Sequence, residues 1–336
     1  MVPLSVLDLS PVSAASSPSD AIRQSPPLAR LCDHLGYTRY WIAEHHNMPS
    51  IATSSPEVLI AHVAATTSRI RVGAGGIMLP NHNPLRVVEM FRTLEALHPG
   101  RIDLGLGRAP GTDPVTASAL RRGAADDPNE RLAELLAFED ATFPALHPYR
   151  TITPMPSDVR LPEIWMLGST LTGAAIAASL GLRYAFAGHF AMRNATAAIA
   201  WYKDHFKPSR RLSNAYAMLA VTVVCGADDE HAARLAAPIR LAIVRSRTGQ
   251  RAPIASVEDA LAYRFTPDEQ AIAAEFLQGA IIGGPDLVHE RLERLAQQTG
   301  ADELMLSALI PGDERFRSFE RVAAAASLAG AHQQEA

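Results

Sequence analysis

The feature that most constrains the fold is a regular alternation of two patterns along the chain. A short run rich in apolar and β-branched residues is followed by apolar residues at helical spacing, and eight such units can be counted. The predicted strands cover residues 4–9, 40–43, 71–78, 101–107, 163–167, 183–187, 217–224 and 303–307. Strands that alternate with helices, with central strands read as continuous apolar runs, indicate a parallel sheet covered by helices. The number of units and their near-regular spacing favour a closed α/β barrel, the (β/α)8 TIM barrel, over an open doubly wound sheet.

The helical patterns between these strands have clear ends. They are predicted at residues 20–35, 56–66, 85–97, 114–122, 129–143, 172–180, 195–206, 230–246, 285–298 and 315–328. Gly36 and Gly300 stand where glycine ends a helix, and His98-Pro99-Gly100 is a stop signal. The chain has 336 residues, enough for one barrel of about 250 residues with excursions. Since no internal repeat or linker is visible, residues 1–336 are predicted to form a single domain.

Composition excludes several classes of function. The net charge is −4 and the basic residues are scattered, so nothing indicates a nucleic-acid or membrane-surface partner. Cys32 and Cys225 are the only cysteines, and neither belongs to a metal-binding spacing, so no metal site is predicted. No signal peptide is recognisable, and no apolar run approaches the ~20 residues of a membrane span. A cytoplasmic protein is therefore expected.

Polar residues follow the second predicted strand. In an α/β barrel the active site lies at the carboxyl ends of the strands, so Glu44-His45-His46-Asn47 is expected at the mouth of the barrel. Neighbouring side chains of an extended segment point in opposite directions, which makes the histidine pair a poor metal site but lets one imidazole face the mouth. Imidazole titrates near neutral pH and suits proton donation or acceptance. A purely structural histidine at a strand end is an equally good explanation.

Glycines are concentrated in the third strand and at the end of the fourth. Gly73, Gly75 and Gly76 weaken a strand interior, which indicates a bulge or the close approach of another group, such as a flat ring system. Close packing against a neighbouring strand would also explain them. The segment Gly105-Leu106-Gly107-Arg108 does not have the spacing of a dinucleotide-binding loop, and three strand-helix units precede it.

Two arginines and a helix start could together bind a phosphate. Arg108 follows the fourth strand and Arg131 lies early in the next predicted helix, although a surface ion pair is the commoner role of either residue. After the fifth strand, Gly168-Ser169-Thr170 leads into a helix with Thr172 in its first turn, where backbone N–H groups and the helix dipole favour an anion. Ordinary capping by Ser169 or Thr170 is the simpler alternative.

Taken together, these segments place an imidazole, a glycine-rich surface and a phosphate site around one barrel mouth. Such a set suits a flat phosphorylated cofactor better than a metal ion or a covalent nucleophile. The chain has no G-x-S-x-G, no H-E-x-x-H and no Walker sequence.

Three motifs in fixed order carry a resemblance to a known family. Residues 40–47, 71–80 and 99–108 resemble the bacterial luciferase family, the luciferase-like flavin-dependent monooxygenases. Residues 283–285, the helix after them and residues 302–306 resemble the last strand-helix segment of that family. The resemblance covers nearly the whole chain, and it implies a TIM barrel that binds FMN.

The resemblance also implies roles for particular residues. A non-prolyl cis peptide is expected at Gly75-Gly76, against the flavin ring. His45 matches the histidine required for the oxygen chemistry, and Glu44 beside it is the second candidate catalytic residue. The FMN phosphate is expected at Arg108, Arg131, Ser169 and Thr172, with Gly107, Met166 and Gly168 as further cofactor contacts. Where family members often have a glutamate before the serine, this chain has Gly168, which changes the contacts near the ribityl chain.

By resemblance, reduced FMN and O2 would oxygenate a small lipophilic or natural-product substrate through a peroxyflavin. A separate flavin reductase would supply the reduced FMN, and the barrel would form a homodimer. Excursions at residues 113–129, 144–162 and 247–278 are expected to shape the substrate pocket. Two alternatives remain. A deazaflavin-dependent hydride-transfer oxidoreductase would use the same arginines, whereas a non-catalytic flavin-binding protein fits less well with eight complete units and His45.

Overall fold

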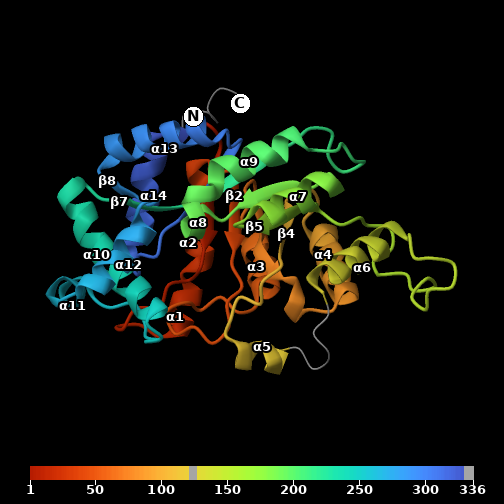
Figure 1. The fold of residues 1–336 in the computed structure, drawn as a ribbon, viewed down its shortest axis with the longest axis horizontal. Coiled ribbons are helices and arrows are strands. Elements are labelled where there is room, and N and C mark those ends of the chain that lie inside the picture. Colours follow the sequence, from red (N-terminus) through yellow and green to blue (C-terminus); the bar gives the residue numbers. More distant parts are fainter. Residues whose placement is uncertain (121–126, 329–336) are drawn as a thin grey trace.

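A closed barrel of eight parallel strands forms the centre of the molecule. The computed structural model describes residues 1–120 and 127–328. The barrel strands are β1 (Leu4–Asp8), β2 (Arg39–Ile42), β3 (Arg71–Met78), β4 (Ile102–Gly107), β5 (Glu163–Gly168), β6 (Arg183–Phe186), β7 (Ala217–Cys225) and β9 (Glu303–Ser307). They pair in this order, and the parallel pairing of β9 with β1 closes the ring. The prediction of a (β/α)8 TIM barrel is confirmed (Figure 1).

Helices surround the barrel, as Figure 1 shows. The longer ones are α2 (Ser25–Leu35), α3 (Pro56–Thr66), α4 (Pro84–Leu97), α6 (Pro128–Asp140), α7 (Leu171–Leu180), α9 (Ala195–Asp204), α10 (Asp229–Arg247), α12 (Pro267–Leu277), α13 (Pro285–Thr299) and α14 (Asp313–Ala325). Shorter elements are α1 (Pro18–Arg23), α5 (Pro114–Leu120), α8 (Gly188–Ala191), α11 (Val257–Ala262), β8 (Ile281–Gly283) and the 3-10 turns η1 (Leu79–Asn81) and η2 (Met192–Asn194). None of the helices in the described part of the chain is long and apolar enough to cross a membrane.

The structure corrects some predicted elements. The helix expected over residues 20–35 is two helices, α1 and α2, which meet at Gln24. Pro26 and Pro27 lack an N–H group, so they fit only the first turn of a new helix. The expected helix over 129–143 ends at Asp140, and the part of the 114–122 helix beyond Leu120 lies outside the described residues, as does the chain end after 328.

Several elements outside the eight predicted strand-helix units were not predicted. β8 is only three residues long and pairs with the end of β7, and α8 is a single turn after β6. The excursion at 247–278 contains α11 and α12, which pack against α10. That residues 1–336 form a single domain stays a prediction.

Alternate residues of the strands face the inside and the outside of the barrel. Leu7, Trp41, Trp165, Met218 and Met305 belong to one buried cluster in the interior. Their neighbours in sequence, such as Val6, Tyr40, Ile42 and Met166, belong to the larger core that lies beneath the helices. This is the two-residue period of a strand, and it decides which residues can reach a ligand inside the barrel.

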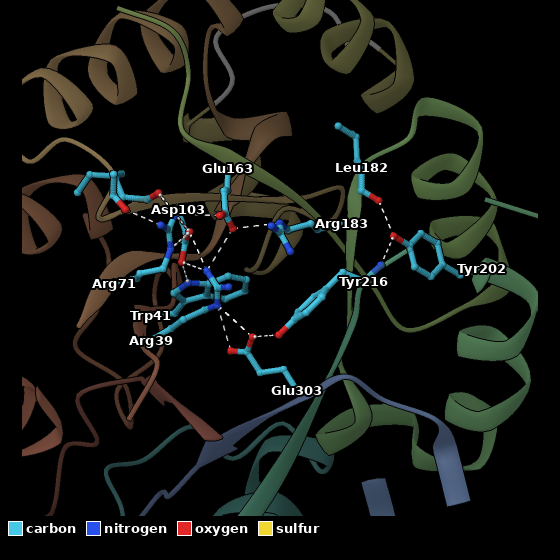
Figure 2. Close-up of polar contacts among 12 residues, drawn as sticks. Arg39, Trp41, Arg71, Asp103, Glu163, Leu182, Arg183, Tyr202, Tyr216 and Glu303 are labelled. Atoms are coloured by element: carbon cyan, nitrogen blue, oxygen red, sulfur yellow. Dashed lines mark hydrogen bonds and ion pairs between the residues drawn. The ribbon is translucent and has the colours of Figure 1, made fainter. Parts of the chain in front are cut away.

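A buried ionic layer closes the amino end of the barrel (Figure 2). Arg39, the first residue of β2, donates from Nε to Glu303 at 3.0 Å and from Nη1 to Asp103 at 2.9 Å. Asp103 also accepts from Arg71 and from the Trp41 indole N–H, the latter at 2.9 Å. Asp103 and Glu303 are fully buried. Because Arg39, Arg71 and Glu303 begin their strands, the layer fills the end opposite the expected active site.

We expect Arg39→Met to lower the free energy of unfolding by about 3–5 kcal/mol, because the substitution leaves two buried carboxylates without their shared cation. Urea unfolding measures this effect. Arg23→Met is the matched control, since Arg23 pairs with Asp20 on the surface and its loss is expected to cost about 0.5 kcal/mol or less. Equal effects of the two substitutions would contradict a stabilising role for the buried layer.

Candidate active site

A cavity of about 470 Å³ opens at the carboxyl ends of the barrel strands. Its apolar lining includes Leu7, Leu9, Trp41, Ala43, Met78, Leu167, Ala185, Phe186, Met218, Ala220 and Met305. Its polar or glycine lining includes His45, Gly75, Gly107, Arg108, Asp127, Asn129, Gly168, Ser169, Thr170 and His189. Most of the residues predicted for the site are therefore brought together around one cavity.

The glycines of β3 form one wall of this cavity. The peptide between Gly75 and Gly76 is cis, as the resemblance implies. Gly75 lines the cavity, and a Cβ atom at this position would lie 2.7 Å from Cδ1 of Leu7. Gly76 does not line the cavity; a Cβ there would lie 2.7 Å from the carbonyl oxygen of Gly105 on β4. Close packing is thus part of the reason for the glycines, and Gly75 also leaves one wall of the cavity flat.

Arg108 and the start of α7 make one end of the cavity suitable for an anion. The Arg108 guanidinium forms no hydrogen bond or ion pair with any residue that the structure describes, and its Nε is buried. Ser169 and Thr170 precede α7, and the Thr170 side chain does not cap that helix. Asp127 and Asn129, at the start of α6, also line the cavity, but the Asp127 carboxylate already caps this helix. An unpaired guanidinium together with the uncapped start of α7 favours a bound phosphate.

Besides Gly76, three predicted cofactor residues do not reach the cavity. Met166 belongs to the core under the helices, because the alternation along β5 turns its neighbour Leu167 inward instead. Arg131 donates from Nη1 to the carbonyl oxygen of His82 at 2.6 Å. Thr172 is exposed in the first turn of α7.

Glu44 is a buried anchor outside the cavity. Its carboxylate accepts hydrogen bonds from the Met78 N–H at 2.8 Å and from His82 Nε2 at 2.9 Å. Its other oxygen lies 2.8 Å from Nε2 of His46 and 3.2 Å from Nδ2 of Asn81. The structure therefore separates the two candidate catalytic residues: His45 lines the cavity, and Glu44 fixes the end of β3 and the turn after it.

The contact between Glu44 and His82 changes the pKa of both groups. Burial raises the pKa of Glu44, but the hydrogen bonds from His82, His46 and the Met78 N–H outweigh it and lower this pKa overall. Burial lowers the pKa of His82, but the hydrogen bond to Glu44 and its charge raise it overall. The pair is therefore held as a carboxylate and an imidazolium over a wider pH range than either group would be alone.

His45 shares the cavity with a histidine that the sequence did not single out. His189 lies in α8, directly after β6, and lines the cavity with His45. Burial lowers the pKa of each imidazole to about 4, and the charge of His45 further lowers that of His189. Both rings are therefore neutral at pH 7. His189 follows a predicted strand, as His45 does, so the argument that selected His45 could also have identified His189.

Comparisons with known proteins give the family. The family model described as luciferase-like monooxygenase matches residues 2–303. A luciferase-like monooxygenase of Escherichia coli (strain K12) is 40% identical over 95% of both chains. An N-acetyl-S-alkylcysteine monooxygenase of Bacillus subtilis (strain 168) is 34% identical over 88% of this chain and 89% of its own. The chain belongs to the luciferase-like monooxygenase family.

Solved structures agree with this assignment. The crystal structure of apo-MsnO8 is 37% identical and superposes with a TM-score of 0.89 over 97% of this chain and 98% of its own. Two more distant structures share the fold. The oxygenating constituent of 3,6-diketocamphane monooxygenase of Pseudomonas putida, in complex with FMN, has a TM-score of 0.68 at 20% identity and covers 96% of both chains. An F420-dependent secondary alcohol dehydrogenase has a TM-score of 0.66 at 13% identity and covers 96% of this chain and 99% of its own.

We expect His82→Gln to destabilise the protein in a pH-dependent way. The folded pKa of His82 is raised, so the contribution of His82 to the stability of the protein is complete below pH 6.5, its ordinary pKa, and is lost as the pH rises through the folded pKa. The folded pKa of Glu44 is lowered, so the contribution of Glu44 to stability is complete above pH 4.5, its ordinary pKa, and is lost as the pH falls through the folded pKa. The loss should be about 1–3 kcal/mol between these two values and smaller on either side. Urea unfolding from pH 4 to 9 measures it; a difference that grows toward pH 9 would contradict this account.

Proposed function

We propose that the protein is an FMN-dependent monooxygenase that uses reduced FMN and O2 to oxygenate a small organic substrate. The observation that carries the proposal is the unpaired Arg108 guanidinium at one end of a cavity that is otherwise lined mainly by apolar and glycine residues. Arg108 is half-buried and its Nε is buried without a partner, so a bound anion would compensate for the water that this cation has lost. The phosphate of FMN is such an anion, and its ring system is flat and largely apolar.

The residues present fit this cofactor. Arg108, with the N–H groups at the start of α7, would hold the phosphate beside Ser169 and Thr170. The wall at Gly75 has no side chain that would keep a flat ring at a distance. Gly107 and Gly168 line the space between these two regions. Arg131 would act indirectly, through the His82 carbonyl and the turn after β3.

When bound, reduced FMN would activate O2 and supply one oxygen atom to the substrate. The contribution of this chain is physical. Leu7, Met218 and Met305 exclude water from the interior of the barrel. His45, neutral at pH 7, can donate one hydrogen bond and accept another at the reacting end of the cavity.

A second cavity, of about 600 Å³, offers a route for the substrate. It shares His45, Met78, Ala109 and Phe190 with the first cavity. Its outer wall includes residues 109–114 and 250–252, which lie in or beside two of the excursions expected to shape the pocket. The excursion at 144–162 lines neither cavity. The relative named N-acetyl-S-alkylcysteine monooxygenase makes an uncharged thioether sulfur a reasonable first group to test as the site of oxygenation.

Partners and location follow from the same proposal. The chain would receive reduced FMN from a separate flavin reductase, as the words "oxygenating constituent" in the name of the Pseudomonas putida relative indicate for that protein. It would act as a homodimer in the cytoplasm, where Cys32 and Cys225, both buried and unpaired, would remain reduced.

Deazaflavin-dependent hydride transfer is the second candidate, because an F420-dependent enzyme shares the fold. Arg108 would bind the phosphate of either cofactor, so direct titration decides between them. Saturable binding of the deazaflavin, with no binding of FMN, would overturn the proposal.

We expect Arg108→Ala to weaken FMN binding by about 2–4 kcal/mol, or about 30- to 1000-fold, because the phosphate loses its charged partner. Quenching of flavin fluorescence during titration measures the dissociation constant. Arg86→Ala is the control, since Arg86 is exposed and pairs with Glu89 on α4. An unchanged constant in Arg108→Ala would remove this residue from the phosphate site.

We expect His45→Ala to retain FMN binding within a few-fold but to lose oxygenation. General acid or base groups typically contribute about 10²–10⁴-fold to a rate. The assay combines the protein with an FMN reductase, NADH, O2 and thioanisole, and measures sulfoxide by chromatography. Oxygenation at the wild-type rate would show that His45 is not the catalytic imidazole.

A further inference from the structure

Two histidines reach the cavity from opposite sides of the barrel. β2 and β6 are four strands apart in the closed ring of eight, so their carboxyl ends face each other across the mouth. His45 stands three residues after the last residue of β2, and His189 stands three residues after the last residue of β6. Both rings line the same cavity, and they are close enough for the charge of one to affect the titration of the other.

Neither ring has a hydrogen-bond partner within the described ranges, 1–120 and 127–328. Nδ1 of His45 and Nδ1 of His189 are both buried without a partner. An unsatisfied buried polar atom is destabilising, so two of them in one cavity need an explanation. Nε2 of each ring is the remaining nitrogen, and it can form a hydrogen bond with a ligand in the cavity.

Few of the residues that line the cavity are charged. Among the lining residues only Arg108 and Asp127 carry a formal charge, and they follow β4 and begin α6. On the other side, β7 presents Met218 and Ala220, and β9 presents Met305. The charged groups nearest His45 are Glu44, already engaged by His82 and Met78, and His46. Arg108 is therefore the one cation that lines the cavity for the anionic end of a ligand, and the two imidazoles are separate polar groups that the rest of the ligand can meet.

We propose that His189 is a second catalytic imidazole, which contacts the reacting end of the ligand from the side opposite His45. This inference deepens the proposed function and rests on it. It also indicates the class of substrate: an organic molecule whose reacting group accepts a hydrogen bond, since the side chains that reach the cavity after β2 and β6 are imidazoles and not ammonium or carboxylate groups.

Two neutral imidazoles can provide a hydrogen-bond donor and a hydrogen-bond acceptor at the same time. Burial lowers the pKa of each to about 4, so at pH 7 each ring has one N–H donor and one nitrogen lone pair. One ring can then donate a hydrogen bond to the reacting group while the other accepts one. A single imidazole on one side of the mouth cannot provide both from opposite directions.

The first experiment compares His189→Phe, His189→Gln and the control His62→Phe, an exposed position on α3. FMN affinity should stay within about threefold of wild type in all three, because the phosphate lies at Arg108. Each protein, loaded with reduced FMN, is then mixed with O2, and the return of oxidised-flavin absorbance is followed without any substrate. We expect this return to be at least 10-fold faster in His189→Phe and within about threefold of wild type in His189→Gln and His62→Phe.

The second experiment needs no flavin. In His45→Gln, NMR titration should show the pKa of His189 rising from about 4, because the charge of His45 no longer opposes its protonation, while burial keeps the value below 6.5. An unchanged pKa would show that the two rings are not neighbours and would overturn the inference.

The first experiment can overturn the inference as well. It would do so if the rate at which oxidised-flavin absorbance returns is unchanged in His189→Phe, or if this rate changes equally in His189→Phe and His189→Gln. If wild-type protein fails to bind FMN, the proposed function fails instead, and the titration alone then decides whether the rings are paired.

Discussion

The structure depends on charge neutralisation inside the barrel at its amino end. Arg39, Asp103 and Glu303 come from three strands that are distant in sequence and meet in a region with almost no solvent. Each carboxylate there is tolerable only because a guanidinium and further donors surround it. The layer links β2, β4 and β9, which do not pair with one another, and it closes one end of the barrel. Binding is thereby restricted to the other end, where the carboxyl termini of the strands meet.

At that other end, polar side chains are used in two distinct ways. The Glu44 carboxylate is hydrogen-bonded to the side chains of His82, His46 and Asn81 and to the Met78 N–H. These bonds hold the segment after β3 in place. Arg108, His45 and His189 have side-chain nitrogens without partners among the residues seen in the structure. The first kind of residue positions the site, and the second kind is available to a ligand. Residue type alone does not separate the two kinds.

This distinction explains why the sequence predicted the fold and part of the site, but not the role of every polar residue. The alternation of apolar runs predicted all eight barrel strands within a few residues, because a buried parallel strand has few alternatives. Gly107, Gly168, Arg108 and His45 line the cavity, as expected of residues that end or follow a strand, and so does Gly75 within β3. Glu44 and Met166 were assigned to the site, but the two-residue alternation directs Met166 outward, and the contacts of Glu44 depend on residues 78–82, which no local pattern reveals. The pairing of His189 with His45 required knowledge of which strands face each other.

The tryptophans add a practical consequence. Trp41 lines the cavity, contacts Trp165 edge to face with ring centroids 5.2 Å apart, and donates its indole hydrogen to Asp103. Only one other tryptophan exists, Trp201, which stacks on His205 in α9. Two of the three tryptophans thus lie between the ionic layer and the cavity. Their fluorescence is expected to respond to changes at both ends of the barrel without any added label.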